Sequence, residues 1–270
     1  NQYIDLNACQ NQTTIENRGL IIGTRALIQN RKLAINYLQQ GKPVLGFTHG
    51  EINNTVFDEP FFGYSEMSLC SVLLDYGEKK LGYNLNQPLA KPTKLLARSS
   101  KEVGKIIGAS NVIRYKKSAM SKKLYIPTSY TGNYHYGPCR SYEDIVYTHW
   151  QSCLVSSIDN LTFKVHPKSP RPKFETSMEM RWLEECVSEY DVLILDYYST
   201  AATIAIFTDK PVIYFDIGLR NINKSYMQLL KERFYYCEID LYGDIHEQIE
   251  CTLKSYLDSK LPCTNDSFKE

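Results

Sequence analysis

The chain has 270 residues, 43% of them hydrophobic, and a formal net charge of +1. This length suits one large domain or two of ordinary size with real cores, and the near-zero charge gives no indication of a nucleic-acid or acidic partner. No apolar run approaches the ~20 residues that a membrane-spanning helix needs, and we expect no signal peptide.

Eight cysteines are spread along the chain: Cys9, Cys70, Cys139, Cys153, Cys186, Cys237, Cys251 and Cys263. None forms a C-x-x-C pair, which argues against a zinc ribbon or a thioredoxin-like site. Several lie in apolar or helical patterns typical of buried thiols, so we expect a protein of the reducing cytosol. The first residue is Asn rather than Met, so we expect a truncated chain or missing upstream sequence.

The first half shows one clear helix and several short apolar runs. Its predicted elements are a helix at 24–40, strands at 44–47, 71–76 and 112–115, and either irregular structure at 97–104 or a small helix near 101–107. Gly41 and Pro43 end the first helix. The run at 44–47 is typical of a buried strand, and the run at 112–115 could be an edge strand.

A basic stretch, 116–123, interrupts the pattern and marks the expected domain boundary. We expect a first domain at 1–120, a second at 121–262 and a tail at 263–270. The second domain is predicted to have strands at 124–127, 161–165, 192–195, 212–215 and 235–239, and helices at 142–157, 178–189, 201–207, 224–233 and 245–257. Strands that alternate with helices predict an α/β fold with mainly parallel sheets.

Two polar turns follow predicted strands of the second half. His166, Pro167 and Lys168 come after one strand, and Asp196–Thr200 comes after another. Histidine and lysine can contact phosphate oxygens, and Ser199 or Thr200 can cap the next helix, whose free N–H groups attract anions. Both turns would share one sheet edge and could face one phosphate ligand. A solvated basic loop and an ordinary helix cap are the alternatives.

Two further loops are candidates. In the first half, Thr48-His49-Gly50-Glu51 follows the strand at 44–47. Glu51 could act as a general base toward an acceptor hydroxyl, with His49 as its rival and Asp58 and Glu59 as weaker alternatives. The alternative is that Glu51 is a loop carboxylate without a catalytic role. The second loop follows the strand at 124–127 and could close on a donor; its candidate residues are Ser129, Tyr130, Gly132 and Asn133.

The order of these motifs resembles the donor half of GT-B glycosyltransferases. The likeness rests on Lys164-Val165-His166-Pro167-Lys168, on Asp191–Thr200 and on Lys210–Phe215, with His49-Gly50 resembling the acceptor-side turn. The chain is most similar to CMP-Kdo transferases of capsule and lipopolysaccharide synthesis and to CDP-glycerol glycerophosphotransferases of teichoic acid synthesis. One departure is Tyr198, where these families more often have Ser after Asp-Tyr. Another is the first half, which is short for a complete acceptor domain.

The resemblance implies two Rossmann-like domains with parallel sheets facing a central cleft. It implies a cytoplasmic, metal-independent transferase without a cofactor, whose donor phosphate contacts His166, Pro167, Lys168, Asp196, Tyr197, Ser199 and Thr200. The partners would be a nucleotide-activated sugar, first of all CMP-Kdo, and a glycan or lipid-linked glycan, with peripheral association at the inner face of the membrane. A CDP-glycerol-type transferase, a UDP-sugar 2-epimerase and a non-catalytic nucleotide-binding module stay open.

Overall fold

The computed structural model describes residues 18–25, 27–47, 68–76, 94–98, 121–127, 144–166, 169, 171–208, 210–220, 222 and 224–259. The chain forms two compact units, 1–99 and 100–270. The structure describes none of the residues from 99 to 120, so the expected boundary near residue 120 stays a prediction. The predicted strand at 112–115 and the small helix near 101–107 lie outside the described residues.

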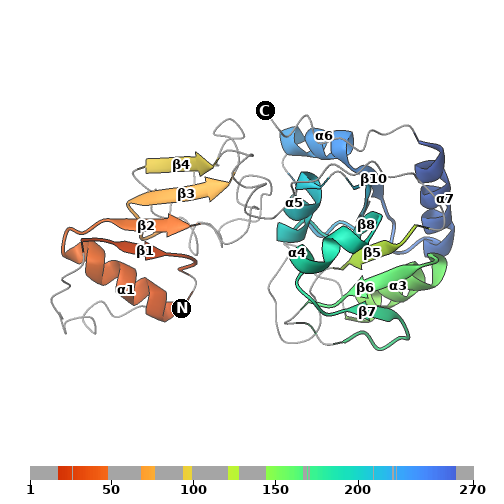
Figure 1. Ribbon diagram of the computed structural model, residues 1–270, viewed down its shortest axis with the longest axis horizontal. Coiled ribbons are helices and arrows are strands. Elements are labelled where there is room, and N and C mark those ends of the chain that lie inside the picture. Colours follow the sequence, from red (N-terminus) through yellow and green to blue (C-terminus); the bar gives the residue numbers. More distant parts are fainter. Residues whose placement is uncertain are drawn as a thin grey trace. The chain divides into compact units, whose positions relative to one another are not determined.

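The first unit holds a parallel sheet in the order β1-β2-β3-β4 (Figure 1). Its elements are β1 (Leu20–Ile22), α1 (Ile28–Gln39), β2 (Val44–Phe47), β3 (Val72–Tyr76) and β4 (Lys94–Arg98). Ala34 and Tyr37 of α1 pack against Val44 and Leu73 in a small core. The helix and the strands at 44–47 and 71–76 are confirmed. Residues 97–98, expected to be irregular, belong to β4 because they pair with β3.

A buried arginine ties three segments of the first unit together. The Arg25 guanidinium is fully buried; its Nε donates to the Ser68 carbonyl oxygen over 2.8 Å and its Nη1 to the Gly23 carbonyl oxygen over 2.8 Å. Gly46 on β2 leaves room for this side chain, because a Cβ there would lie 2.5 Å from Arg25 Nη1. The absence of a side chain at residue 46 therefore permits the packing of Arg25.

The second unit holds a six-stranded parallel sheet in the order β10-β9-β8-β5-β6-β7. Its strands are β5 (Lys123–Ile126), β6 (Leu161–Lys164), β7 (Ser177–Glu179), β8 (Val192–Leu195), β9 (Val212–Asp216) and β10 (Tyr235–Glu238). Two strands run outward from β5 on one side and three on the other, which is the strand order of a Rossmann fold. The expectation of α/β architecture with two parallel sheets is confirmed.

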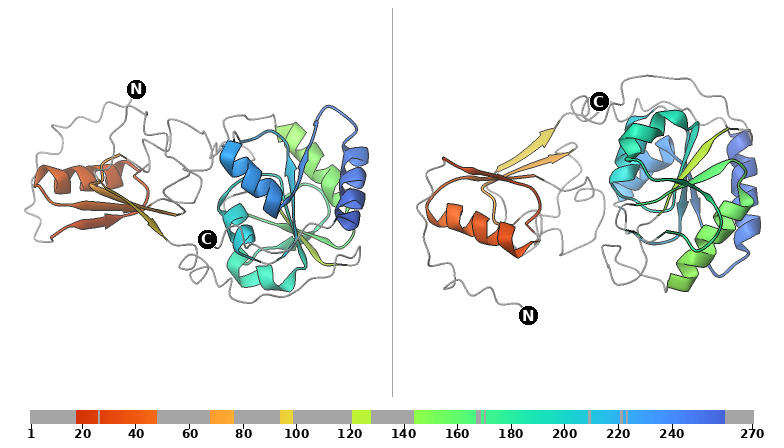
Figure 2. Two further views of the ribbon diagram at one scale, coloured as in Figure 1. Left: turned by 90° about the horizontal axis from the view of Figure 1, so that it is seen from above. Right: turned by 60° about the horizontal axis from the view of Figure 1, so that its bottom comes forward.

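Helices cover both faces of this sheet (Figures 1 and 2). The helices α3 (Asp144–Ser157) and α7 (Ile245–Asp258) lie on one face, and α4 (Leu183–Cys186), α5 (Thr200–Phe207) and α6 (Lys224–Arg233) lie on the other. Trp150 of α3 packs edge-to-face on Phe215 of β9, with ring centroids 5.6 Å apart. Because both faces are covered, the central strand β8 is apolar and buried at every residue, as the sequence predicted. Among the described residues, no helix is long and apolar enough to cross a membrane.

One predicted helix of the second unit is wrong in part. Residues 178–189 were expected to be helical, but β7 takes up Ser177–Glu179, and α4 is followed by a 3-10 turn at Val187–Glu189. Met178 pairs with Phe163 of β6 in the edge position of the sheet. A three-residue strand has too few residues to show alternation in its sequence, and pairing with β6 decides its conformation.

Candidate functional site

The strand order of the second sheet reverses between β5 and β8. These strands are direct neighbours, with Ile126 opposite Leu195. The chain leaves β5 toward β6 on one side, and leaves β8 toward β9 on the other. Open α/β sheets bind ligands at such a switch point, just beyond the carboxyl ends of the strands. The turn Asp196–Thr200 follows β8 and lies directly at this point.

Asp196 begins the turn and points into the protein. It is only 1% exposed, and its Oδ2 accepts hydrogen bonds from the Tyr125 hydroxyl and, over 3.0 Å, from the Trp150 indole N–H. Burial, and next the Asp196 charge, raise the pKa of the Tyr125 hydroxyl well above its ordinary value, so that it stays a donor. Asp196 thus fixes the turn to β5 and α3. The polar groups of the turn that lie at the edge of the sheet belong to the residues after Asp196.

Ser199 is the N-cap of α5. Its backbone is extended, with φ of −148°, and its Oγ accepts from the Ala201 N–H over 3.3 Å. Of the two predicted caps, Ser199 is therefore the one that the structure bears out. Ser199 is half-buried and Thr200 is exposed, so two hydroxyls lie beside the first N–H groups of α5. This combination can hold an anion.

The two tyrosines of the turn have different surroundings. Tyr198 is fully buried and donates its hydroxyl to the Tyr226 hydroxyl on α6 over 2.7 Å. Tyr197 lies under a cation instead, because the Arg220 guanidinium is centred 4.6 Å from its ring centroid and donates to its hydroxyl. Tyr198 stands where the enzymes that the sequence resembles more often have Ser after Asp-Tyr. Its side chain packs toward α6, and Ser199 is the residue that caps the helix.

The last residue of β9 and the loop after it hold polar groups that the sequence did not single out. Asp216 Oδ1 accepts from the Gly218 N–H over 2.8 Å, and Oδ2 accepts from the Tyr236 hydroxyl. Gly218 has φ of +78°, a conformation that favours glycine, and Arg220 follows two residues later. Burial lowers the pKa of Arg220 to about 10. Little in the sequence indicated that Arg220 belongs to the site, because a single arginine in a loop forms no recognisable motif.

The second predicted turn follows β6 at the same edge. His166 is exposed, and its carbonyl oxygen accepts from the Ser169 N–H over 2.9 Å, which closes a turn. The preceding Val165 donates its N–H to the Glu179 carbonyl oxygen over 3.0 Å, so β7 holds the start of this turn. One strand, β5, separates β6 from β8. The sheet therefore brings His166 and residues 196–200 to one edge, as predicted.

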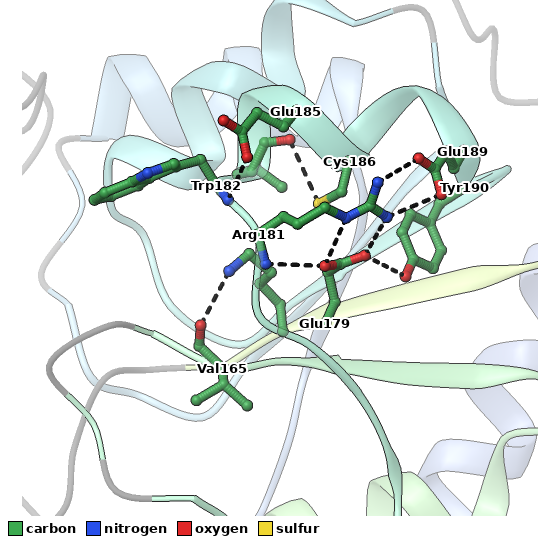
Figure 3. Close-up of polar contacts among 10 residues, drawn as sticks. Val165, Glu179, Arg181, Trp182, Glu185, Cys186, Glu189 and Tyr190 are labelled. Carbon is green, nitrogen blue, oxygen red and sulfur yellow. Dashed lines mark hydrogen bonds and ion pairs between the residues drawn. The ribbon is translucent and has the colours of Figure 1, made fainter.

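A charged cluster braces the end of β7 (Figure 3). Arg181 lies between two carboxylates, with Nη2 2.6 Å from Glu179 Oε2 and Nη1 2.6 Å from Glu189 Oε1. The Tyr190 hydroxyl also donates to Glu179 Oε2, over 3.3 Å. Hydrogen bonds from Arg181 are the main cause that lowers the pKa of Glu179 to about 2. The cluster fixes the strand that supports Val165, next to His166.

Several predicted site residues lie outside the described part of the chain: His49, Glu51, Ser129, Tyr130, Gly132, Asn133, Pro167 and Lys168. Their roles stay predictions. Within the described ranges, no three side chains of His, Cys, Asp or Glu gather as a set of metal ligands.

No protein family and no curated protein matches the chain. Among solved structures, the chain is similar to spinosyn forosaminyltransferase SpnP, with 8% sequence identity and a TM-score of 0.49. The similarity covers 92% of this chain and 69% of that chain. The function therefore has to be inferred from the residues at the switch point.

Proposed function

We propose that the protein is a GT-B-type glycosyltransferase that binds a nucleotide-activated sugar and transfers the sugar to a bacterial surface glycan. The observation that carries this proposal is the turn at the switch point, where Ser199 caps α5 beside the exposed Thr200. Parallel sheets of this strand order bind nucleotides at this place, and the cap leaves N–H groups and hydroxyls available to a phosphate.

In this proposal the leaving nucleotide is held on two sides. The hydroxyls of Ser199 and Thr200 and the N–H groups of α5 bind its phosphate, and His166 donates to it from the neighbouring turn, with Lys168 as a further cation. These groups stabilise the negative charge that develops as the bond between sugar and phosphate breaks. Asp196 supports them indirectly, since its buried carboxylate fixes the turn to Tyr125 and Trp150.

Glu51 is the proposed general base, and His49 is the alternative. Glu51 would take the proton from the acceptor hydroxyl as the hydroxyl oxygen attacks the sugar. A donor linked through one phosphate fits a compact site of histidine, lysine and hydroxyl groups, so CMP-Kdo is our first choice. CDP-glycerol and UDP-sugars come next.

Calorimetric titration of the whole chain with CMP, CDP, UDP and GDP tests the donor site. We expect a cytidine nucleotide to bind best, and His166→Ala to weaken its binding about tenfold by removing one hydrogen bond to a charged group. The absence of binding by all four nucleotides at millimolar concentration would refute the proposal.

A transfer assay tests the catalytic carboxylate. Glu51→Gln should keep nucleotide affinity and abolish sugar transfer, because the amide cannot accept the acceptor's proton. Retained transfer would exclude Glu51 as the base and leave His49 to be replaced next. Turnover of a UDP-sugar without any acceptor would point to an epimerase instead. Nucleotide binding without turnover of any donor would point to a binding module.

A further inference from the structure

A cation that the sequence did not single out lies beside the candidate phosphate turn. The guanidinium of Arg220 is centred 4.6 Å from the ring centroid of Tyr197, two residues before the cap Ser199. It also donates a hydrogen bond to the Tyr197 hydroxyl. Arg220 follows β9, which is the direct neighbour of β8, so both loops lie at the same edge of the sheet.

The loop that carries Arg220 has a defined structure. Asp216 accepts from the Gly218 N–H over 2.8 Å and from the Tyr236 hydroxyl of β10, which ties the start of the loop to the neighbouring strand. Ile217 and Leu219 are each 1% exposed and anchor the backbone in the core. Arg220, the next residue, is thereby directed toward Tyr197 by a fixed backbone and a stacked ring.

We propose that Arg220 is a phosphate-binding residue of this site, and that its ligand is the phosphate or diphosphate of a nucleotide. This inference rests on the proposed function, and adds a cation from a second loop to the site that the sequence motifs predicted at His166 and Lys168. A planar guanidinium can bind two phosphate oxygens with a fork of parallel hydrogen bonds, whereas a lysine acts as a point charge. Stacking on Tyr197 holds the side chain in place before the ligand arrives, so less conformational freedom is lost on binding.

The partial burial of Arg220 supports the same role. Burial lowers the pKa of its guanidinium to about 10, so the group is fully charged at neutral pH. A charge that is partly shielded from water attracts an anion more strongly than a solvated one, because the local dielectric is lower.

The test compares wild type with Arg220→Gln and Arg220→Lys. Binding of CMP, CDP and inorganic pyrophosphate is measured by calorimetry on the whole chain. We expect Arg220→Gln to weaken nucleotide and pyrophosphate binding by about 10- to 100-fold, the effect of losing one charged hydrogen-bonding group. Arg220→Lys should lose roughly 3- to 10-fold, since charge remains without the fork. Lys254→Gln, an exposed residue of α7, controls for the loss of one positive charge.

The outcomes separate this inference from the proposed function. Equal nucleotide affinity in wild type and Arg220→Gln would overturn the inference and leave the proposed function standing. Pyrophosphate binding that depends on Arg220, without any nucleotide binding, would overturn the nucleotide as the ligand and refute the proposed function. Binding of neither probe by wild type would overturn both. If Arg220→Gln does not show native tryptophan fluorescence, Arg220→Lys decides, and affinity equal to wild type would overturn the inference.

Discussion

Trp150 on α3 donates its indole N–H to the carboxylate of Asp196 over 3.0 Å, and so ties the first residue of the candidate phosphate turn to a helix 46 residues earlier in the chain. The Tyr125 hydroxyl on β5 donates to the same oxygen. All three side chains are buried. The turn at the switch point is thus held by contacts to two other elements of the second unit, which keeps its polar edge in a fixed position.

We expect Asp196→Ala to destabilise the second unit by about 3 kcal/mol, because it leaves two buried donors without their acceptor. Both tryptophans of the chain, Trp150 and Trp182, lie in the second half, so their fluorescence during urea unfolding reports on that half alone. In a Tyr125→Phe background, which has lost one of the donors, the same replacement should cost less. Equal losses in both backgrounds would show that the hydroxyl and the carboxylate do not interact.

Replacing Ser199 separates the cap from the anion site. Ser199→Ala should cost about 1 kcal/mol of stability, because the Ala201 N–H loses its side-chain acceptor. Ser199→Asp should retain the cap, since Asp is as good an N-cap residue, and add a negative charge where we place the phosphate. We therefore expect an Asp variant of near wild-type stability with nucleotide affinity about tenfold weaker or worse. Unchanged affinity in the Asp variant would place the phosphate elsewhere.

Gly46→Ala should destabilise the first unit by about 1–3 kcal/mol, the usual effect of overpacking a core. The added Cβ would lie 2.5 Å from Arg25 Nη1, and the fully buried guanidinium would have to leave its hydrogen bonds to Gly23 and Ser68. Gly23→Ala is the matched control, because no atom lies within 4 Å of a Cβ at that position. Urea unfolding of both variants is followed by far-UV circular dichroism, which reports on the secondary structure of the whole chain. Equal stability of the two variants would contradict the packing of Arg25 under β2.

The sequence predicted the elements whose signals are local. Val44–Phe47 and Val192–Leu195 are short apolar runs, and Lys224–Arg233 has helical spacing; all three have the predicted bounds. It missed β7, because a three-residue strand is decided by its pairing with β6. It could not show the partners of the Asp196 carboxylate, which come from residues 46 and 71 positions away. Arg220 was missed for the same reason, since only the fold brings it to Tyr197.

The cluster at the end of β7 gives a pH dependence with a defined sign. Hydrogen bonds from Arg181 lower the pKa of Glu179 to about 2, whereas an unfolded glutamate has a pKa of about 4.3. Between these values the unfolded chain binds more protons, so stability rises with pH there. The contribution of Glu179 is fully present above about pH 5, and is lost as the pH falls through 4 toward 2.

The test measures unfolding by urea at several pH values from 6 to 3, followed by tryptophan fluorescence. We expect Glu179→Gln to be less stable than wild type at pH 6, and the difference between them to shrink steadily as the pH falls. Glu184→Gln, an exposed carboxylate on α4, controls for the loss of one negative charge. A difference between wild type and Glu179→Gln that stays constant down to pH 3 would show that Arg181 does not hold the charged form of Glu179, and that the brace beside His166 is not electrostatic.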